Sequence, residues 1–354
     1  IARNSTFTYK GRAVDVKQVG KELGVRYVVE GSVRRMGDRV RITAQLIEAA
    51  TGAHVWADRF DRKLAELFDV QDEVVRSIVA STQTQVVINE GLLAEHAAKP
   101  QLQVWELAKR GWKNLYGLTL ESIEEAGRLG RKIIELDARS AKGHQLVAAA
   151  DFHLVFMGFA HDTEKLTTEA LGEAQEATRL DRRDEYSFWV LGTVLGTLLG
   201  RSDEGIAAYR QALDINPNFS VAYGSIGTTL AVAGRADESF EYTNMAMRLN
   251  PRDPSFFFRY TILSLAHFAK SEFDEARQWA DRAVARKPDW WLGHALLAAS
   301  RGCIGDHVGS CDAVRALLRL LPQVGVSRLP FQAIRDQRLR DVFLNSLRVA
   351  GLPE

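Results

Sequence analysis

Polar and apolar residues alternate one by one in three stretches near the start of the chain. In the clearest of them, Val40, Ile42, Ala44 and Leu46 are separated by Arg39, Arg41, Thr43 and Gln45. A period of two places one set on a buried face and the other in water. The alternation predicts three antiparallel strands, and Gly37-Asp38 and Ala50-Thr51-Gly52 mark the turns between them. The predicted strands cover 27–33, 40–46 and 54–60.

Helical spacing flanks these strands. Val16, Val19 and Leu23 recur at i, i+3 and i+7, with Asp15 placed to cap the helix and Gly24 placed to end it. A second helical pattern runs from about residue 68 to 88. Residues 1–88 are therefore predicted to form an α+β module, an antiparallel sheet with helices.

A polar, small-residue stretch over 89–103 reads as a connector, and helical periodicity then dominates the rest of the chain. Pairs of helices with short breaks are predicted between 104 and 322, and a final helix closes the region 323–354. The helices are expected near 104–115, 122–136, 141–158, 164–180, 185–199, 202–215, 220–233, 236–249, 255–270, 273–287, 290–302, 309–321 and 336–350.

An internal repeat runs through this helical region. Residues 212–217 (ALDINP) are echoed by 246–251 (AMRLNP), so that Pro217 and Pro251 lie 34 positions apart. Pro288 and Pro322 are also 34 apart, whereas Pro251 and Pro288 are 37 apart, which predicts an insertion near 252–254. Leu136 and Leu180 are 44 apart, which predicts a longer insertion near 158–165.

This repeat resembles the tetratricopeptide (TPR) family over roughly 220 residues, with about four well-matched repeats. The resemblance implies an all-α superhelix in which small residues let helices approach closely; these include Gly227, Ala246, Ala276 and Ala283. It also implies a concave groove, built mainly from the first helix of each pair, that takes a protein or peptide ligand. The charged helix over 336–350 is expected to cap the array.

The first module resembles the TolB-amino-terminal-like domain. Four blocks in order carry this likeness: ARNSTFTYK at 2–10, LGVRYVVEGSV at 23–33, RITAQLI at 41–47 and TGAHVWAD at 51–58. In that family the domain often lies between an upstream effector and TPR repeats. The effector is commonly a class III adenylate/guanylate cyclase or a CadC-like winged-helix DNA-binding domain. The resemblance implies that the chain is the regulatory part of a longer bacterial signalling protein, lacking the domain's earlier strand and helix. It transfers no catalytic residue.

Net charge and composition narrow the function classes. A formal net charge of +1 gives no strong field for nucleic acid or membrane, so we expect neither partner. The two cysteines cannot form a disulfide framework, which agrees with a cytoplasmic location. The apolar run 189–199 is too short to span a bilayer.

Few residues suggest chemistry. Cys303, His307 and Cys311 are four apart, but glycines at 305 and 309 predict a helix turn between them, which argues against a metal site. A cluster of arginines flanks the first hairpin turn, and we interpret it as a solvated sheet edge rather than a phosphate site; it comprises Arg34, Arg35, Arg39 and Arg41. Glycine-rich phosphate loops, HExxH and GxSxG patterns are missing from the sequence, so we predict a non-catalytic chain with no cofactor.

Aromatic residues on the predicted first helices are the candidate groove residues: Tyr223, Phe257, Tyr260, Trp290 and His294. Such side chains anchor bound peptides. The alternative, that they form the core between repeats, is favoured for any single one of them. Three functions stay open: the regulatory region of a nucleotide cyclase, the sensory region of a CadC-like transcription regulator, and an enzyme within this chain.

Overall fold

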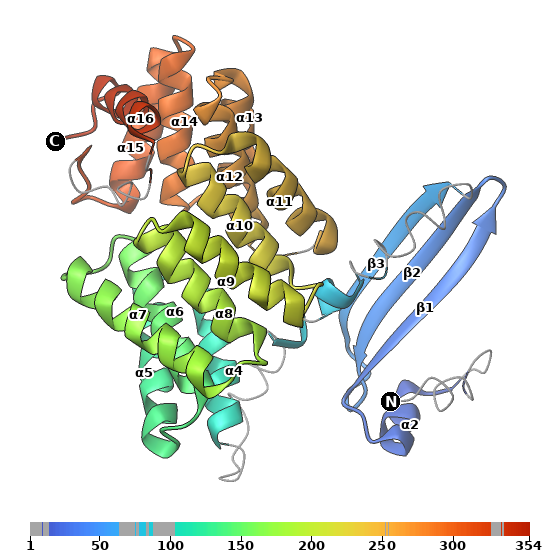
Figure 1. Ribbon diagram of the computed structural model, residues 1–354. Helices are drawn as coiled ribbons and strands as arrows, with labels where there is room; N and C mark the ends of the chain where they lie inside the picture. Colours follow the sequence, from blue (N-terminus) through green and yellow to red (C-terminus); the bar gives the residue numbers. More distant parts are fainter. Residues whose placement is uncertain are drawn as a thin grey trace. The chain divides into compact units, whose positions relative to one another are not determined.

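The computed structural model divides the chain into two compact units, Ile1–Asn89 and Glu90–Glu354 (Figure 1). The structure describes residues 9, 14–63, 75, 78–82, 85–87, 103–251, 253, 255–326, 334 and 336–354.

The first unit begins with helix α2 (Val16–Leu23), and both of its predicted ends are confirmed. The Asp15 carboxylate accepts a hydrogen bond from the Lys17 amide at 2.9 Å, which caps the amino-terminal end. Gly24 ends the helix with a φ of 63°, in the left-handed region where a residue without a Cβ is favoured.

Three strands follow as an antiparallel sheet in the order β1-β2-β3. They are β1 (Tyr27–Met36), β2 (Arg39–Glu48) and β3 (His54–Lys63), each longer than predicted. Leu46 and Trp56 face each other across β2 and β3 and are buried. Ile78 and Val86 pack against this pair, so the helical segment after the sheet covers β2 and β3. The predicted helix 68–88 is helical at 75, 78–82 and 85–87, and its other residues lie outside the described part.

The apolar residues of β1 are not buried as the alternation suggests. Val29 is 53% exposed and Val33 is 68% exposed, although their partners in the register, Leu46 and Ile42, are buried or half-buried. The reason is position: β1 pairs with one strand only in the described sheet, and the apolar contacts of 78–87 reach β2 and β3. Sequence alternation identifies a face but not what covers it.

The second unit is an all-helical, TPR-like superhelix (Figure 1). The helices lie where the periodicity predicts, within a few residues at their ends. They are α4 (Gln103–Leu115), α5 (Leu120–Leu136), α6 (Ala141–Phe156), α7 (Thr163–Leu180), α8 (Glu185–Thr193) with η3 (Val194–Leu198), α9 (Ser202–Ile215), α10 (Ser220–Val232), α11 (Ala236–Leu249), α12 (Phe256–Ala269), α13 (Phe273–Arg286), α14 (Trp291–Cys303), α15 (His307–Leu320) and α16 (Gln337–Val349).

Small residues hold the helices of each pair together. Ala276, Ala280 and Ala283 of α13 are buried, as are Ala170, Ala174 and Ala177 of α7. Alanine at these positions lets the partner backbone approach while burying apolar surface. First helices contact the first helices of neighbouring pairs, as α4 with α6 and α12 with α14, and so form the inner wall of the superhelix.

Each first helix ends at a residue with positive φ. In four pairs this residue is a glycine: Gly158, Gly200, Gly234 or Gly305. In the pairs of α4 and α12 it is Leu118 or Ser271. These glycines therefore mark the end of the first helix also in the pairs that have no proline at the repeat position. One departure from regular helix occurs in α8, where residues 194–198 form a single π-helical segment, η3.

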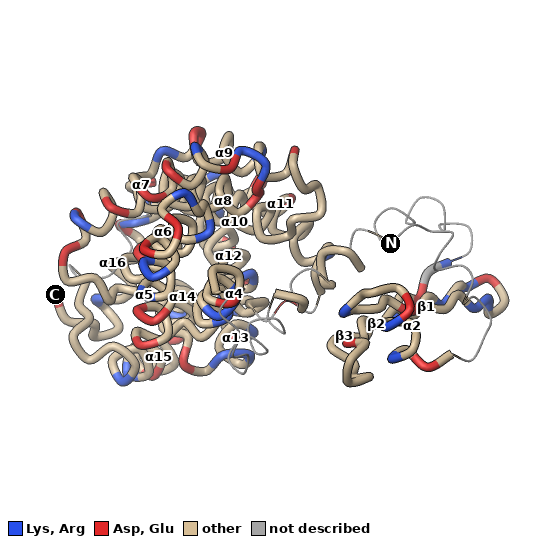
Figure 2. The backbone as a smooth tube through the Cα atoms, turned by 90° about the horizontal axis from the view of Figure 1, so that it is seen from below, with Lys and Arg blue, Asp and Glu red and all other residues tan. Residues whose placement is uncertain are grey.

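The carboxy-terminal helix α16 packs on α14. Phe343 is fully buried with its ring 5.7 Å from that of Phe268, and the Asp336 carboxylate caps α16 by accepting from the Leu339 amide. Lysine, arginine and carboxylate residues of the helical unit are intermixed over its surface (Figure 2). Among the described helices, none combines the length and apolarity needed to cross a bilayer.

Candidate functional site

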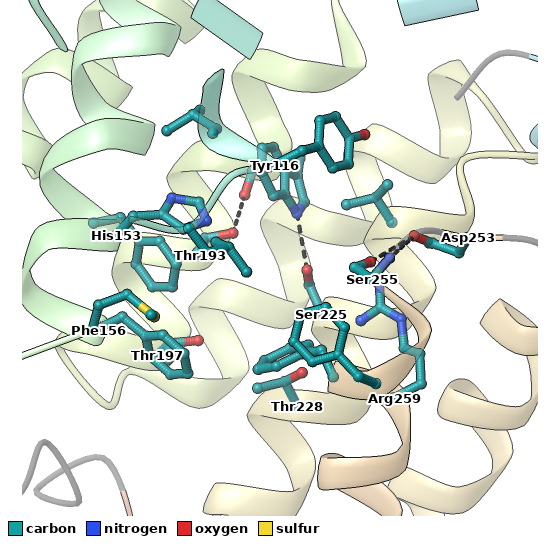
Figure 3. Close-up of a pocket in the computed structure, with 18 of the residues that line it drawn as sticks. Tyr116, His153, Phe156, Thr193, Thr197, Ser225, Thr228, Asp253, Ser255 and Arg259 are labelled. Atoms are coloured by element: carbon teal, nitrogen blue, oxygen red, sulfur yellow. Dashed lines mark hydrogen bonds between the residues drawn. The ribbon is translucent and has the colours of Figure 1, made fainter. Parts of the chain in front are cut away.

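A cavity of about 180 Å³ opens on the inner wall of the superhelix (Figure 3). The side chains that form it come from α4, α6, α8, η3, α9, α10 and α12, so it exists only when several repeats are stacked. Its principal lining residues are Trp112, Tyr116, Phe152, His153, Phe156, Tyr186, Trp189, Thr193, Thr197, Ser225, Thr228, Asp253, Phe257, Phe258, Arg259 and Trp290.

Aromatic rings make one wall of the cavity. Trp112 of α4 lies 5.0 Å from Tyr186 and 5.8 Å from Trp189, ring centroid to centroid. Tyr186 and Trp189 are three apart on α8, so both project from the same side of that helix. These tilted contacts hold the rings rigidly and give a wall suited to flat or branched apolar groups.

Most polar groups of the wall already have partners within the protein. The Trp189 indole N–H donates to Ser225 Oγ at 2.9 Å, and the Tyr209 hydroxyl donates to Thr193 Oγ1 at 3.2 Å. Thr228 Oγ1 donates to the Gly224 carbonyl at 2.9 Å. These bonds fix the wall and leave few of its hydroxyl groups available to a ligand.

Arg259 and Asp253 are the charged residues of the cavity, and each is 5% exposed. Asp253 Oδ1 accepts from the amide and the hydroxyl of Ser255, at 2.8 and 2.6 Å. Arg259 comes from α12, and its guanidinium carbon lies 5.8 Å from the centroid of the Phe258 ring. Burial lowers the pKa of Arg259, while the charges of Asp253 and Tyr116 act in the opposite direction.

His153 adds a neutral imidazole to the lining. Its Nδ1 lies 2.6 Å from the Ala149 carbonyl oxygen, which can only accept, so Nδ1 carries the proton. Burial lowers the pKa of His153, and this effect exceeds that of the backbone hydrogen bond. A neutral ring with Nδ1 protonated leaves Nε2 as an acceptor.

The five candidate groove residues do not come together. Phe257 and Trp290 line the cavity, and both are buried, at 5% and 2% exposure. Tyr223 is half-buried, with its ring 6.4 Å from Tyr242 on the second helix α11. Tyr260 is also half-buried and lies 5.4 Å from Trp279 on the second helix α13. His294 is not among the residues that line the cavity, and its Nε2 lies 2.8 Å from the Pro288 carbonyl oxygen.

Sequence reasoning missed Arg259, Asp253 and the ring cluster of Trp112, Tyr186 and Trp189. One signal was available: Arg259 is the single lysine or arginine in the run FFFRYTILSLAHFA (256–269). A lone cation in an apolar helix is either exposed to solvent or buried beside groups that compensate its charge. The ring cluster had no such signal, because Trp112 and Tyr186 are far apart in the sequence.

The remaining candidates take structural positions. Cys303 ends α14 and His307 begins α15, as the glycine-marked turn predicts, and the Cys303 thiol lies 3.2 Å from Ser346 Oγ. Within the described ranges, no group of three or more His, Cys, Asp or Glu residues gathers as metal ligands. In the hairpin, Arg34, Arg35 and Arg39 are exposed, and Arg41 Nε donates to Asp61 Oδ1 at 2.7 Å.

A buried carboxyl on α6 makes stability depend on pH. Asp151 is 1% exposed, and its Oδ2 has no hydrogen-bond partner among the described residues. Burial raises its pKa to about 7; Arg131 opposes the rise, and Glu169 and Glu173 add to it. In the unfolded chain the pKa is about 3.9. The folded state therefore binds more protons between these values, and stability falls as pH rises from about 4 to about 7.

We expect Asp151→Asn to flatten this dependence. Between pH 5 and pH 8 the wild type should lose about 2 kcal/mol more stability than the variant, since each pKa unit corresponds to about 1.36 kcal/mol. Urea unfolding at the two pH values measures the difference. Asp214→Asn, at an exposed position of α9, is the control and should follow the wild type. Parallel pH profiles for wild type and Asp151→Asn contradict the assignment.

Comparison with known proteins agrees with this architecture. No protein-family model matches the chain. A protein of Rhizobium meliloti (strain 1021) named "Putative adenylate cyclase 3" is 39% identical over 207 residues, which cover 58% of this chain. The chain spans about a third of that relative's length, 35%.

Two solved structures of IFIT1 share the fold at low identity. A human IFIT1 dimer with m7Gppp-AAAA aligns with a TM-score of 0.53 and 18% identity, over 61% of this chain and 50% of that one. A monomeric IFIT1 mutant with Gppp-AAAA aligns with a TM-score of 0.55 and 17% identity, over 77% and 65%. At this identity the likeness concerns the fold alone. The helical unit is thus a TPR-like superhelix.

Proposed function

We propose that this chain is the regulatory region of a bacterial class III adenylate/guanylate cyclase, and that its superhelix binds a protein or peptide partner. The observation that carries the proposal is the 39% identity over 207 residues to a relative named as an adenylate cyclase, in a chain that folds as stacked helix pairs. The same relative favours the cyclase over a CadC-like regulator.

The mechanism follows from the architecture. Each helix pair contacts mainly its neighbours, so a partner that binds along the inner wall changes the stacking of several pairs together. Partner binding can shift an upstream catalytic domain only if the partner has different affinities for its active and inactive arrangements. In this proposal the chain supplies that coupling and carries out no reaction itself. Residues 1–88 are assigned to a TolB-like module as part of the same proposal.

Deletion of the superhelix tests the regulatory role. We expect the full-length parent protein to convert ATP or GTP to the cyclic nucleotide at a rate that changes at least threefold when residues 100–354 are removed. The response of that rate to cell extract should disappear with them. The measurement is product formed per minute at equal concentrations of the two proteins. Equal rates together with equal responses to extract remove the regulatory claim.

Point variants separate partner binding from folding. Tyr223→Ala combined with Tyr260→Ala changes two half-buried first-helix positions and should weaken the response to extract. Val308→Ala, at a residue of α15 that is 76% exposed, is the control and should leave the response unchanged. Circular dichroism verifies that both proteins keep their helix content. An unchanged response in the folded double variant places the partner surface elsewhere.

A further inference from the structure

The Arg259 guanidinium is the one feature of the cavity that helix packing does not account for. Arg259 is 5% exposed and lines the cavity. Its guanidinium forms no hydrogen bond or ion pair with any described residue. A buried cation needs both an opposite charge and acceptors for its N–H groups. The Asp253 carboxylate supplies the charge and acts against burial to raise the pKa of Arg259, but it accepts no hydrogen bond from the guanidinium. The guanidinium therefore has unused hydrogen-bond donors that face the cavity space (Figure 3).

The surroundings of Arg259 are shaped to hold it there. A Cβ atom on Gly224 of α10 would lie 2.1 Å from the guanidinium carbon, so the guanidinium packs directly against the Gly224 backbone. The aromatic ring of Phe258 lies on another side at 5.8 Å and attracts the cation through its π face. The structure thus positions the guanidinium near one buried carboxylate, Asp253, and leaves its N–H groups without an acceptor among the described residues.

We propose that the cavity binds a small organic monocarboxylate, with its carboxylate on Arg259 and its apolar body against the aromatic wall. Arginine presents its N–H groups in a planar fork that matches a carboxylate in two parallel hydrogen bonds. Trp112, Tyr186 and Trp189 supply the apolar surface for the rest of the molecule.

The size of the cavity limits the ligand. An engineered apolar cavity of about 150 Å³ takes benzene. A cavity of about 180 Å³ accommodates a single ring with a short acid side chain, or an aliphatic acid of similar size. A folded peptide segment or a nucleotide is too large for it.

Asp253 restricts the charge of the ligand. It is also buried and lines the cavity, and Ser255 holds it by two hydrogen bonds. Arg259 and Asp253 together give the lining a formal charge of zero, so a bound monoanion leaves one uncompensated negative charge in the buried site and a dianion leaves two. The neutral His153 adds no positive charge. The site therefore favours a monoanion.

Occupation of the cavity joins first helices from five pairs, α4 to α12, through one ligand. The ligand would hold those helices in one arrangement and so affect the whole inner wall. Binding of such an acid involves this chain alone and does not depend on which effector lies upstream.

Titration with phenylacetate tests the proposal. We expect saturable binding to the 354-residue chain with a Kd of about 1 mM or tighter, measured by isothermal calorimetry and by ligand-observed NMR. Phenylacetamide, which has the same shape and no charge, should bind at least tenfold more weakly. Acetate, which lacks the apolar body, should show no saturable binding at 10 mM. Hexanoate and 3-phenylpropionate extend the panel in case the ring or chain length matters.

Two variants test the roles of the charged residues. Arg259→Met should weaken phenylacetate binding at least tenfold and leave phenylacetamide unchanged. Asp253→Asn should tighten phenylacetate binding at least threefold. Arg319→Met, at an exposed position near the end of α15, is the matched control and should bind like the wild type.

Stability without ligand separates a binding role for Arg259 from a structural one. Arg259→Met alone leaves the buried Asp253 carboxylate without its opposing charge, so the variant for this measurement is Arg259→Met combined with Asp253→Asn. If Arg259 serves binding only, this double variant should leave the Tm of the unliganded chain unchanged or raise it. A Tm lowered by more than 5 °C in this double variant contradicts the proposal. So does the absence of binding by phenylacetate, 3-phenylpropionate and hexanoate at 10 mM, or equal affinity for phenylacetate and phenylacetamide.

Discussion

Replacing Trp290 by alanine is expected to lower the free energy of unfolding of the helical unit by about 4 kcal/mol. Trp290 is 2% exposed, and its ring lies 5.2 Å from Phe257 and 5.9 Å from Phe258. Its indole N–H donates to Thr261 Oγ1 at 2.9 Å. Truncation removes all these contacts and leaves a space that the stacked helices cannot fill by collapse.

Urea unfolding, followed by circular dichroism, measures the loss. Amide hydrogen exchange over α12 to α15 shows whether the loss is local, because a repeat array need not unfold in one step. Trp290→Phe is the intermediate variant and is expected to lower the free energy of unfolding by about 1.5 kcal/mol. The Thr261 hydroxyl still donates to the Phe257 carbonyl there, so it keeps a partner. A loss below 1 kcal/mol for alanine shows that Trp290 does not act as core and revives its role as a groove anchor.

Gly205→Ala is expected to lower the free energy of unfolding by about 3 kcal/mol. The added Cβ would lie 2.6 Å from the Cα of Gly196 and 2.8 Å from the Gly192 carbonyl oxygen. Both atoms belong to the backbone of α8 and η3, so no side-chain rotation relieves the clash. The overlap outweighs the gain of about 1 kcal/mol that alanine brings to a helix interior.

Gly172→Ala is the matched control. Gly172 lies on α7, also the second helix of its pair, and a Cβ there meets nothing within 4 Å. This variant should therefore gain about 0.5 to 1 kcal/mol from helix propensity alone. Urea midpoints of the two variants, compared at equal m-values, give the contrast. If the two substitutions change the free energy of unfolding equally, the backbones of α8 and α9 lie farther apart than in this structure.

These substitutions also bear on the candidate groove. Trp290 and Phe257 are buried deeply enough that their truncation acts on stability before it acts on a partner. Tyr223 and Tyr260 are half-buried and keep contact with second helices, so their truncation costs less and serves better in binding tests. Loss of partner binding in Trp290→Ala alone thus carries no weight without the stability measurement.

The sequence by itself determined the order of the elements and much of their ends. Period-two and helical patterns depend on neighbours within one turn or one strand pair, and caps such as Asp15 and Asp336 act on the next few amides. The 34-residue echoes predicted the stacked helix pairs, because every pair must solve the same packing problem against its neighbours. Four short blocks of residues also predicted a TolB-like module and a cyclase association, and these two remain proposals.

Only the tertiary structure decided what surrounds each residue. The exposure of Val29 and Val33 depends on which strands a helix covers. A period of two in the sequence does not contain that information. The cavity needs Trp112, Tyr186 and Arg259 to converge from three helix pairs, which depends on the rotation between pairs and on the π-helical segment η3. A sequence pattern reports the face of one helix, whereas a site between helices is set by how far each pair turns relative to the next.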